Sequence, residues 1–102
     1  MGSDVILEFD KAGLYRKIRG ILAKHGADLG ALNVIVSKAS VRIQGALYRQ
    51  PGIQSEFTPE IIDAMLREIK AVPGAPRLEV QFDNWAPAGT GGAWKRTKPD
   101  LR

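Results

Sequence analysis

The apolar residues of this 102-residue chain change their spacing from one segment to the next, and this change limits the fold more than any other feature. In RLEVQFD, residues 77 to 83, apolar and polar residues alternate, which is typical of a strand with one buried face. Within residues 10 to 26, by contrast, Leu14, Ile18 and Leu22 recur at helical spacing. The chain therefore combines strands and helices, each of which needs a partner layer for its apolar side.

The same reasoning divides the chain into six segments of regular structure. Asp10 is expected to cap the first helix. Thr58-Pro59-Glu60 marks the start of the second helix, because it combines a capping hydroxyl, a proline at the first helical position and an acid in the first turn. The predicted segments are a strand over 4–9, a helix over 10–26, strands over 32–36 and 40–49, a helix over 58–72 and a strand over 77–83.

This order, strand-helix-strand-strand-helix-strand, predicts an α+β domain with two layers. Both helices must bury an apolar stripe on one face of the sheet, so we expect a small mixed sheet of three or four strands with two helices on one face. The order of the strands within the sheet stays open. Residues 1–84 are expected to form this single domain, followed by a largely disordered Gly-, Pro- and charge-rich tail over 85–102, with Trp85 folded back on the domain.

Gly45 lies in the middle of the predicted strand over 40–49, on the side that Val41 and Ile43 turn toward the core. A residue without a side chain at this position predicts either a bulge or a close approach of a helix to the sheet. Gly74, which follows the second helix, is expected to supply a positive backbone angle. Both glycines are therefore interpreted as structural residues.

A family pattern runs through these segments. A helix precedes a hairpin that carries V-x-I-x-G-x-L, and a second helix ends in V-x-G before a strand that alternates toward an asparagine. The residues concerned are Val41, Ile43, Gly45, Leu47, Val72, Gly74, Leu78, Val80 and Asn84. Over roughly residues 10 to 84 this pattern resembles the BON domain. BON domains are associated with phospholipid or membrane-surface binding and with protein partners, commonly in the bacterial envelope, so the resemblance implies a binding module.

The composition narrows the chemistry that we expect. The chain has no cysteine and one histidine, so neither a disulfide nor a transition-metal site is predicted. His25 falls in the last turn of the first helix, where an interaction with the terminal carbonyl groups explains it. No glycine-rich phosphate motif lies between a strand and a helix. We therefore expect a protein that is not an enzyme and has no catalytic residues, cofactor or metal.

Basic side chains are the candidates for a binding surface, since the net charge of +4 suits an anionic partner. The first helix carries its cations away from the apolar stripe. The tail combines a tryptophan with cations, which suits contact with anionic lipid or with single-stranded nucleic acid. The candidate residues are Arg16, Lys17, Arg19 and Lys24 on the helix, with Trp94, Lys95 and Arg96 as a flexible second contact.

Two interpretations of function remain open. The first is a noncatalytic, BON-like binding module that attaches to an anionic membrane surface or to a protein partner. The alternative is a ferredoxin-like domain that binds single-stranded nucleic acid weakly or forms a homodimer through an exposed face of the sheet. No apolar run reaches the roughly 18 residues of a membrane span and no signal-peptide pattern is present, so a cytoplasmic protein is expected, while the family resemblance implies the envelope.

Overall fold

The computed structural model describes residues 10–88 and 94–97 of the chain. The elements are α2 (Lys11–Lys24), the 3-10 turn η1 (Leu29–Ala31), β1 (Leu32–Val36), β2 (Ser40–Gly45), α3 (Pro59–Lys70), β3 (Arg77–Phe82), β4 (Trp85–Pro87) and β5 (Trp94–Arg96). The strand predicted over residues 4–9 lies outside the described residues.

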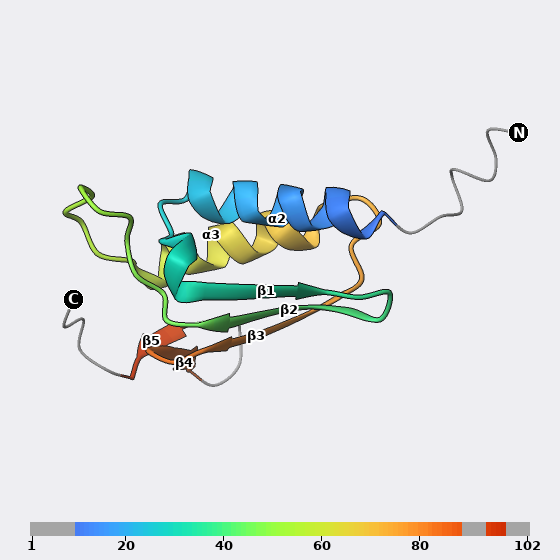
Figure 1. Ribbon diagram of the computed structural model, residues 1–102. Helices are drawn as coiled ribbons and strands as arrows, with labels where there is room; N and C mark the ends of the chain where they lie inside the picture. The colour runs from blue at the N-terminus through green and yellow to red at the C-terminus, as the bar shows by residue number, and fades with distance from the viewer. Residues whose placement is uncertain (1–9, 89–93, 98–102) are drawn as a thin grey trace, which may run out of the picture.

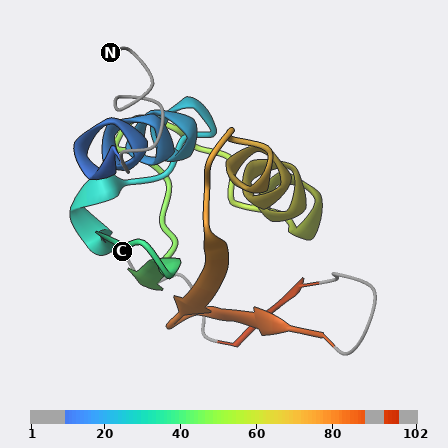
Figure 2. The ribbon, with the colours of Figure 1, turned by 90° about the vertical axis from the view of Figure 1, so that its right-hand side faces the viewer.

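The helices and the main sheet form two layers, which confirms the predicted α+β fold (Figure 1). β2 is the central strand of the sheet, antiparallel to β1 and parallel to β3. Both helices cover the same face of this mixed sheet, as the end view in Figure 2 shows. No helix among the described residues is long and apolar enough to cross a membrane.

The direct pairing of β2 with β3 gives the strand order that the sequence left open. Val41 pairs with Leu78, and Ile43 pairs with Val80, in a continuous parallel register. A ferredoxin-like domain splits such a parallel pair by placing another strand between its members. The described sheet therefore lacks the strand order of a ferredoxin-like domain, while the functions expected with that alternative, weak binding of single-stranded nucleic acid or homodimerisation, stay predictions.

Local signals explain where the two helices begin. The Asp10 carboxylate accepts a hydrogen bond of 2.9 Å from the backbone N–H of Gly13 at the start of α2. The Thr58 hydroxyl accepts one of 3.2 Å from the N–H of Ile61 at the start of α3. Each cap satisfies a backbone donor that the first helical turn leaves without a partner. Both predicted helix starts are confirmed.

The core lies between the helices and the covered face of the sheet. It consists of apolar side chains at helical spacing and at alternate strand positions, which are removed from water by the contact between the layers. The central buried residues are Leu14, Ile18 and Leu22 of α2, Ile62, Met65, Leu66 and Ile69 of α3, and Leu32, Val34, Val36, Val41 and Ile43 of the sheet.

Gly45 ends β2 and is needed for a reason other than contact with a helix. Its φ is +117°, a conformation that side chains disfavour. A Cβ atom there would overlap the carbonyl oxygen of Ala31 and lie 3.2 Å from the Cα of Leu32. The close neighbour is thus the backbone entering β1, so of the two interpretations of Gly45 the close approach of a helix is wrong. The positive φ predicted for Gly74 is confirmed at +80°.

Part of the predicted disordered tail has regular structure. β4 pairs with β5 to form a second, antiparallel two-stranded sheet. Trp85 is buried in the core, and the Trp94 ring lies 5.6 Å from that of Phe82. These two tryptophans supply the apolar surface that holds the strands on the domain. The expected disorder is corrected for 85–87 and 94–96, and residues 89–93 and 98–102 lie outside the described residues.

Candidate binding surface

α2 presents a basic side to solvent because its apolar stripe is used against the sheet. The helix sequence contains five Lys and Arg residues and no acidic residue. Lys11 lies in the first turn, where a cation opposes the helix dipole and does not favour helix stability. This arrangement is therefore better explained by a positive surface than by the stability of the helix itself.

The four cations predicted on α2 differ in their contacts. Arg16 and Lys17 are exposed and form no ion pair with another described residue. Arg19 donates a hydrogen bond of 3.2 Å to the Tyr15 hydroxyl and lies 5.5 Å from the centre of that ring. Lys24 forms an ion pair of 2.6 Å with Glu68 of α3. The available positive charge is therefore concentrated in the first half of α2.

Glu68 joins the end of α2 to α3. Its two carboxylate oxygens lie 2.6 Å from the Lys24 Nζ and 2.9 Å from the His25 Nε2. The hydrogen bond from Lys24, followed by that from His25, lowers the pKa of Glu68. The imidazole of His25 therefore contacts a carboxylate of the neighbouring helix, which corrects the predicted contact with the terminal carbonyl groups of α2.

Those carbonyl groups are satisfied by the loop that follows β2. The Arg49 Nη1 donates a hydrogen bond of 2.5 Å to the carbonyl oxygen of His25. The Gln50 Nε2 donates to the carbonyl oxygens of Ala23 and Ala27, at 3.1 Å and 3.3 Å. Because donors near a helix C-terminus satisfy its free acceptors, this loop fixes the end of α2.

A groove of about 620 Å³ lies between the first half of α2 and β1. It is lined by Lys11, Ala12, Tyr15 and Arg16 of α2 and by Val34, Ile35 and Val36 of β1. Tyr15 and Ile35 are 37% and 43% exposed, although both are large hydrophobic residues. Both charged residues of the lining are cations. The groove thus combines apolar contact surface with positive charge.

Sequence reasoning missed this groove, although one signal was present. In LNVIV, residues 32 to 36, the alternation places Leu32, Val34 and Val36 on one face and leaves Ile35 on the other. An isoleucine at an outward position exposes apolar surface. The sequence pattern alone does not show that this residue lines the same groove as Tyr15.

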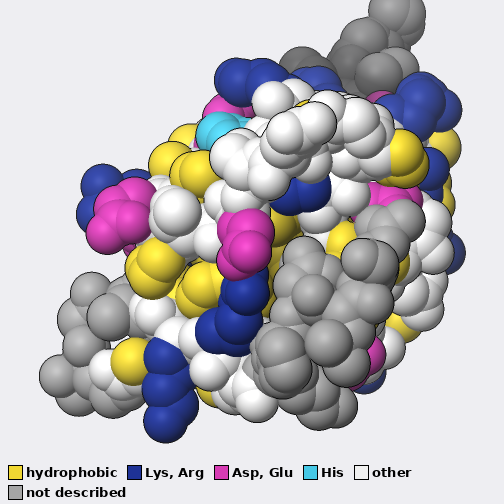
Figure 3. All heavy atoms as spheres, turned by 90° about the vertical axis from the view of Figure 1, so that its left-hand side faces the viewer, with side chains coloured by type: hydrophobic (Ala, Val, Ile, Leu, Met, Phe, Trp, Pro, Cys, Tyr) yellow, Lys and Arg dark blue, Asp and Glu magenta, His cyan; other side chains and the backbone are white. Residues whose placement is uncertain are grey.

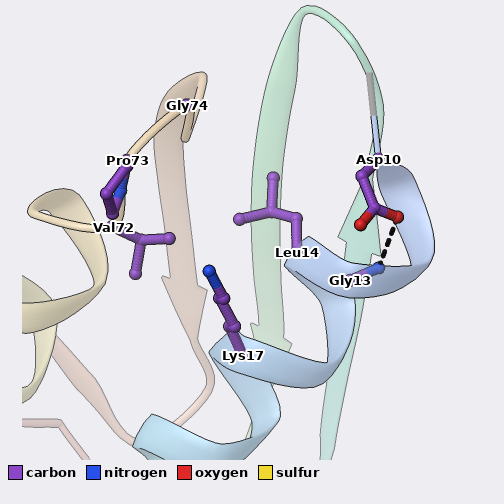
Figure 4. A pocket seen from close by; sticks show the side chains of 7 residues that line it. All are labelled: Asp10, Gly13, Leu14, Lys17, Val72, Pro73 and Gly74. Atoms are coloured by element: carbon purple, nitrogen blue, oxygen red, sulfur yellow. Dashed lines mark hydrogen bonds between the residues drawn. The ribbon is translucent and has the colours of Figure 1, made fainter. Parts of the chain in front are cut away.

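A smaller hollow of about 230 Å³ lies on the other side of α2, where the segment after α3 passes the start of the helix. Figure 4 shows Leu14 and Lys17 pointing toward Val72 across it. The carboxylate of Asp10 is engaged with Gly13 in the helix cap. Ligand pockets usually measure about 300 to 1,000 Å³, so this hollow is small for a ligand-binding site.

The predicted second contact lies elsewhere. Arg96 forms an ion pair of 2.7 Å with Glu56 and lies 5.3 Å from the Trp85 ring centre, while Lys95 is exposed. In Figure 2, β5 lies beyond the β3 side of the main sheet, beneath α3, whereas α2 lies over β1, so the two predicted surfaces are not brought together. On the end of the molecule in Figure 3, Lys and Arg side chains lie beside Asp and Glu side chains.

The face of the main sheet that points away from the helices is mostly polar. Arg42 of β2 lies 3.2 Å from Glu79 of β3, and Gln44 pairs in register with Gln81. Ile35 is the large hydrophobic residue on this face. Paired charges and amides are typical of a solvated face, so the composition gives little support to a homodimer formed through it.

Within residues 10–88 and 94–97, no group of three His, Asp or Glu side chains is placed to hold a metal ion. Comparison with protein-family models, curated proteins and solved structures finds no match for this chain. The structure therefore defines the protein as a two-layer α+β domain with a basic helix beside an apolar groove.

Proposed function

We propose that this domain is a noncatalytic binding module that attaches to an acidic protein partner through the basic side of α2. The observation that carries the proposal is the composition of that helix, which has cations on its solvent side and no acid. Such a surface attracts acidic partners and repels basic ones. The residues are Lys11, Arg16, Lys17, Arg19 and Lys24. The resemblance to BON domains also supports a binding role.

The groove favours a protein partner over a membrane surface. A helix that lies in a bilayer interface inserts its apolar face among the lipids. The apolar residues of α2, such as Ile18 and Leu22, are fully buried against the domain. Attachment of α2 to lipid would therefore rest on charge alone, whereas a protein segment can also contact Tyr15 and Ile35.

The contacts of the titratable residues support a role without catalysis. His25 and Glu68 contact each other at the surface, and Glu68 also pairs with Lys24. Neither residue lines the groove or the hollow beside α2. A general base must lie in the site that holds the substrate, within reach of the proton that it removes. His25 and Glu68 lie outside both of these cavities.

The experiment compares two variants with the same net charge. In the helix variant, Lys11, Arg16 and Lys17 are replaced by Gln. In the control variant, the exposed cations Lys38, Lys70 and Arg77 are replaced by Gln, so each variant has a net charge of +4 − 3 = +1. Binding of a fluorescent, capped decaglutamate peptide is measured at several salt concentrations, alongside vesicles of phosphatidylcholine with and without phosphatidylserine.

We expect the helix variant to bind decaglutamate at least about tenfold more weakly than the control variant, with the difference reduced by salt. Equal losses in the two variants would contradict a site on α2, because they would indicate a response to net charge. Binding to anionic vesicles without binding to decaglutamate would contradict the protein partner and favour the membrane.

A further inference from the structure

β1 is an edge strand of the described sheet, and the groove beside α2 runs along it. Hydrogen bonds at both ends of the β1–β2 hairpin define its ladder. Ser37 donates to the carbonyl oxygen of Ser40 at 2.9 Å, and Ala46 donates to that of Ala31 at 3.1 Å. Hydrogen-bonded pairs alternate with non-bonded pairs along an antiparallel ladder. These two bonds therefore fix which residues of β1 face β2.

Ala31 and Ser37 belong to hydrogen-bonded pairs, and Asn33 and Ile35 are every second residue between them. The backbone N–H and C=O groups of Asn33 and Ile35 therefore bond to β2. The N–H and C=O groups of Val34 and Val36 consequently point to the outer edge of β1, whereas the N–H of Leu32 donates to the carbonyl oxygen of Leu29 in η1. Val34 and Val36 also line the groove. The edge thus offers a row of backbone donors and acceptors, which is the template for an added strand.

The two sides of this edge differ in chemistry. On the helix side lie Lys11 and Arg16, and on the opposite side lies Ile35. Side chains of an incoming strand point alternately to the two sides. A strand with acids at every second position and apolar residues between them would therefore meet the cations with one side and Ile35 with the other.

We propose that the outer edge of β1, which is unpaired in the described sheet, binds an extended segment of the partner, with alternating acidic and apolar residues, as an additional β-strand. This inference rests on the proposed function, since it names how the acidic partner is held. Backbone hydrogen bonds would supply affinity, and the alternating side chains would supply specificity.

A second copy of the chain fits this edge less well. Pairing of β1 with β1 of another copy would be symmetric and would place the two α2 helices along the same junction. Lys11 and Arg16 of one copy would then approach those of the other, and like charges across an interface are unfavourable. An acidic strand has the complementary charge.

The test is amide hydrogen exchange of the full chain, read residue by residue by NMR. The probe is a capped eight-residue peptide of alternating Glu and Val at saturating concentration. Its controls are a Lys–Val peptide with the same pattern and a peptide with four Glu followed by four Val. We expect exchange at Val34 and Val36 to slow at least about tenfold with the first peptide alone, because a new ladder protects those amides.

Substitution at the apolar side of the edge gives a second measurement. Ile35→Gln should weaken binding of the Glu–Val peptide at least about fivefold, as apolar contact is lost. Ile53→Gln is the matched control, because Ile53 is 39% exposed but lies in the loop after β2, outside the groove. Since Ile35 is exposed, both variants should retain the unfolding temperature of the native chain.

Several results would overturn the proposal. Decaglutamate binding that depends on α2, with no added protection of β1 by the Glu–Val peptide, would reject the edge site and leave the proposed function intact. Failure of both peptides to bind would reject both proposals. Slow exchange at Val34 and Val36 in the free protein would show that the edge is already paired, within the chain or between copies.

Discussion

The side chain of Asn84 forms hydrogen bonds in both directions with the backbone of Leu47. Its Oδ1 accepts from the Leu47 N–H at 2.8 Å, and its Nδ2 donates to the Leu47 carbonyl oxygen at 3.0 Å. Asn84 is only 4% exposed, so these groups have little access to water. The amide continues the pairing between the second and third strands beyond Gly45, where regular pairing ends, and it holds Leu47 in the core.

Replacement of Asn84 by Ala should therefore destabilise the domain. It leaves the buried N–H and C=O of Leu47 without partners, and an unsatisfied buried group costs about 1–3 kcal/mol. Urea unfolding monitored by tryptophan fluorescence measures the change. Asp83→Ala, at an exposed neighbour, should change the free energy of unfolding by less than about 0.5 kcal/mol. Equal effects of the two substitutions would contradict this role for Asn84.

Three glycine-to-alanine substitutions should separate backbone strain from steric overlap. Gly45→Ala suffers both and should cost about 1–3 kcal/mol or more. Gly74→Ala has the positive φ but open space around its Cβ, so it should cost less. Gly20→Ala lies in an exposed helical position with open space and should stabilise by up to about 1 kcal/mol. Chemical unfolding measures the free energy of unfolding of each variant. An unchanged value for Gly45→Ala would contradict the close approach of the backbone as the reason for a glycine at this position.

The contact of Glu68 with Lys24 and His25 should make the stability depend on pH. Because the pKa of Glu68 is lowered in the folded state, the ionised carboxylate stabilises the fold above its unfolded-state pKa. That contribution is lost as the pH falls below about 4.5 through the folded pKa. Glu68→Gln should therefore show a flatter decline in unfolding free energy over this acidic range. If the unfolding free energy of the native chain and of Glu68→Gln fell in parallel with pH, the contribution of the Glu68 carboxylate to stability would be contradicted.

The contacts of Arg96 predict an effect on stability without an effect on binding. Arg96→Ala removes the ion pair with Glu56 and the contact with the Trp85 ring. Such contacts are each worth about 0.5–1 kcal/mol near a surface, so a loss of about 1 kcal/mol is expected. Decaglutamate affinity should change less than about twofold. A loss as large as that of the α2 variant would instead support the predicted second contact at 94–96.

The helix starts and the alternation of the strands follow from the sequence because their signals are local. Asp10 and Thr58 act on backbone groups three residues away, and Val41 and Ile43 share a face by strand geometry. The basic side of α2 follows from helical spacing in the same way. The β4–β5 pairing could not be read from a segment without an apolar period, since it depends on burial of Trp85 against the domain.

The two kinds of element, their order and the positive charge of α2 can be read from the amino-acid sequence, because each depends on neighbours along the chain. The direct pairing of β2 with β3, the edge position of β1 in the described sheet and the groove that Tyr15 and Ile35 both line are visible only in the folded chain. Strand order and grooves arise when segments distant in sequence pack together, and the free energy of that packing depends on all of them at once.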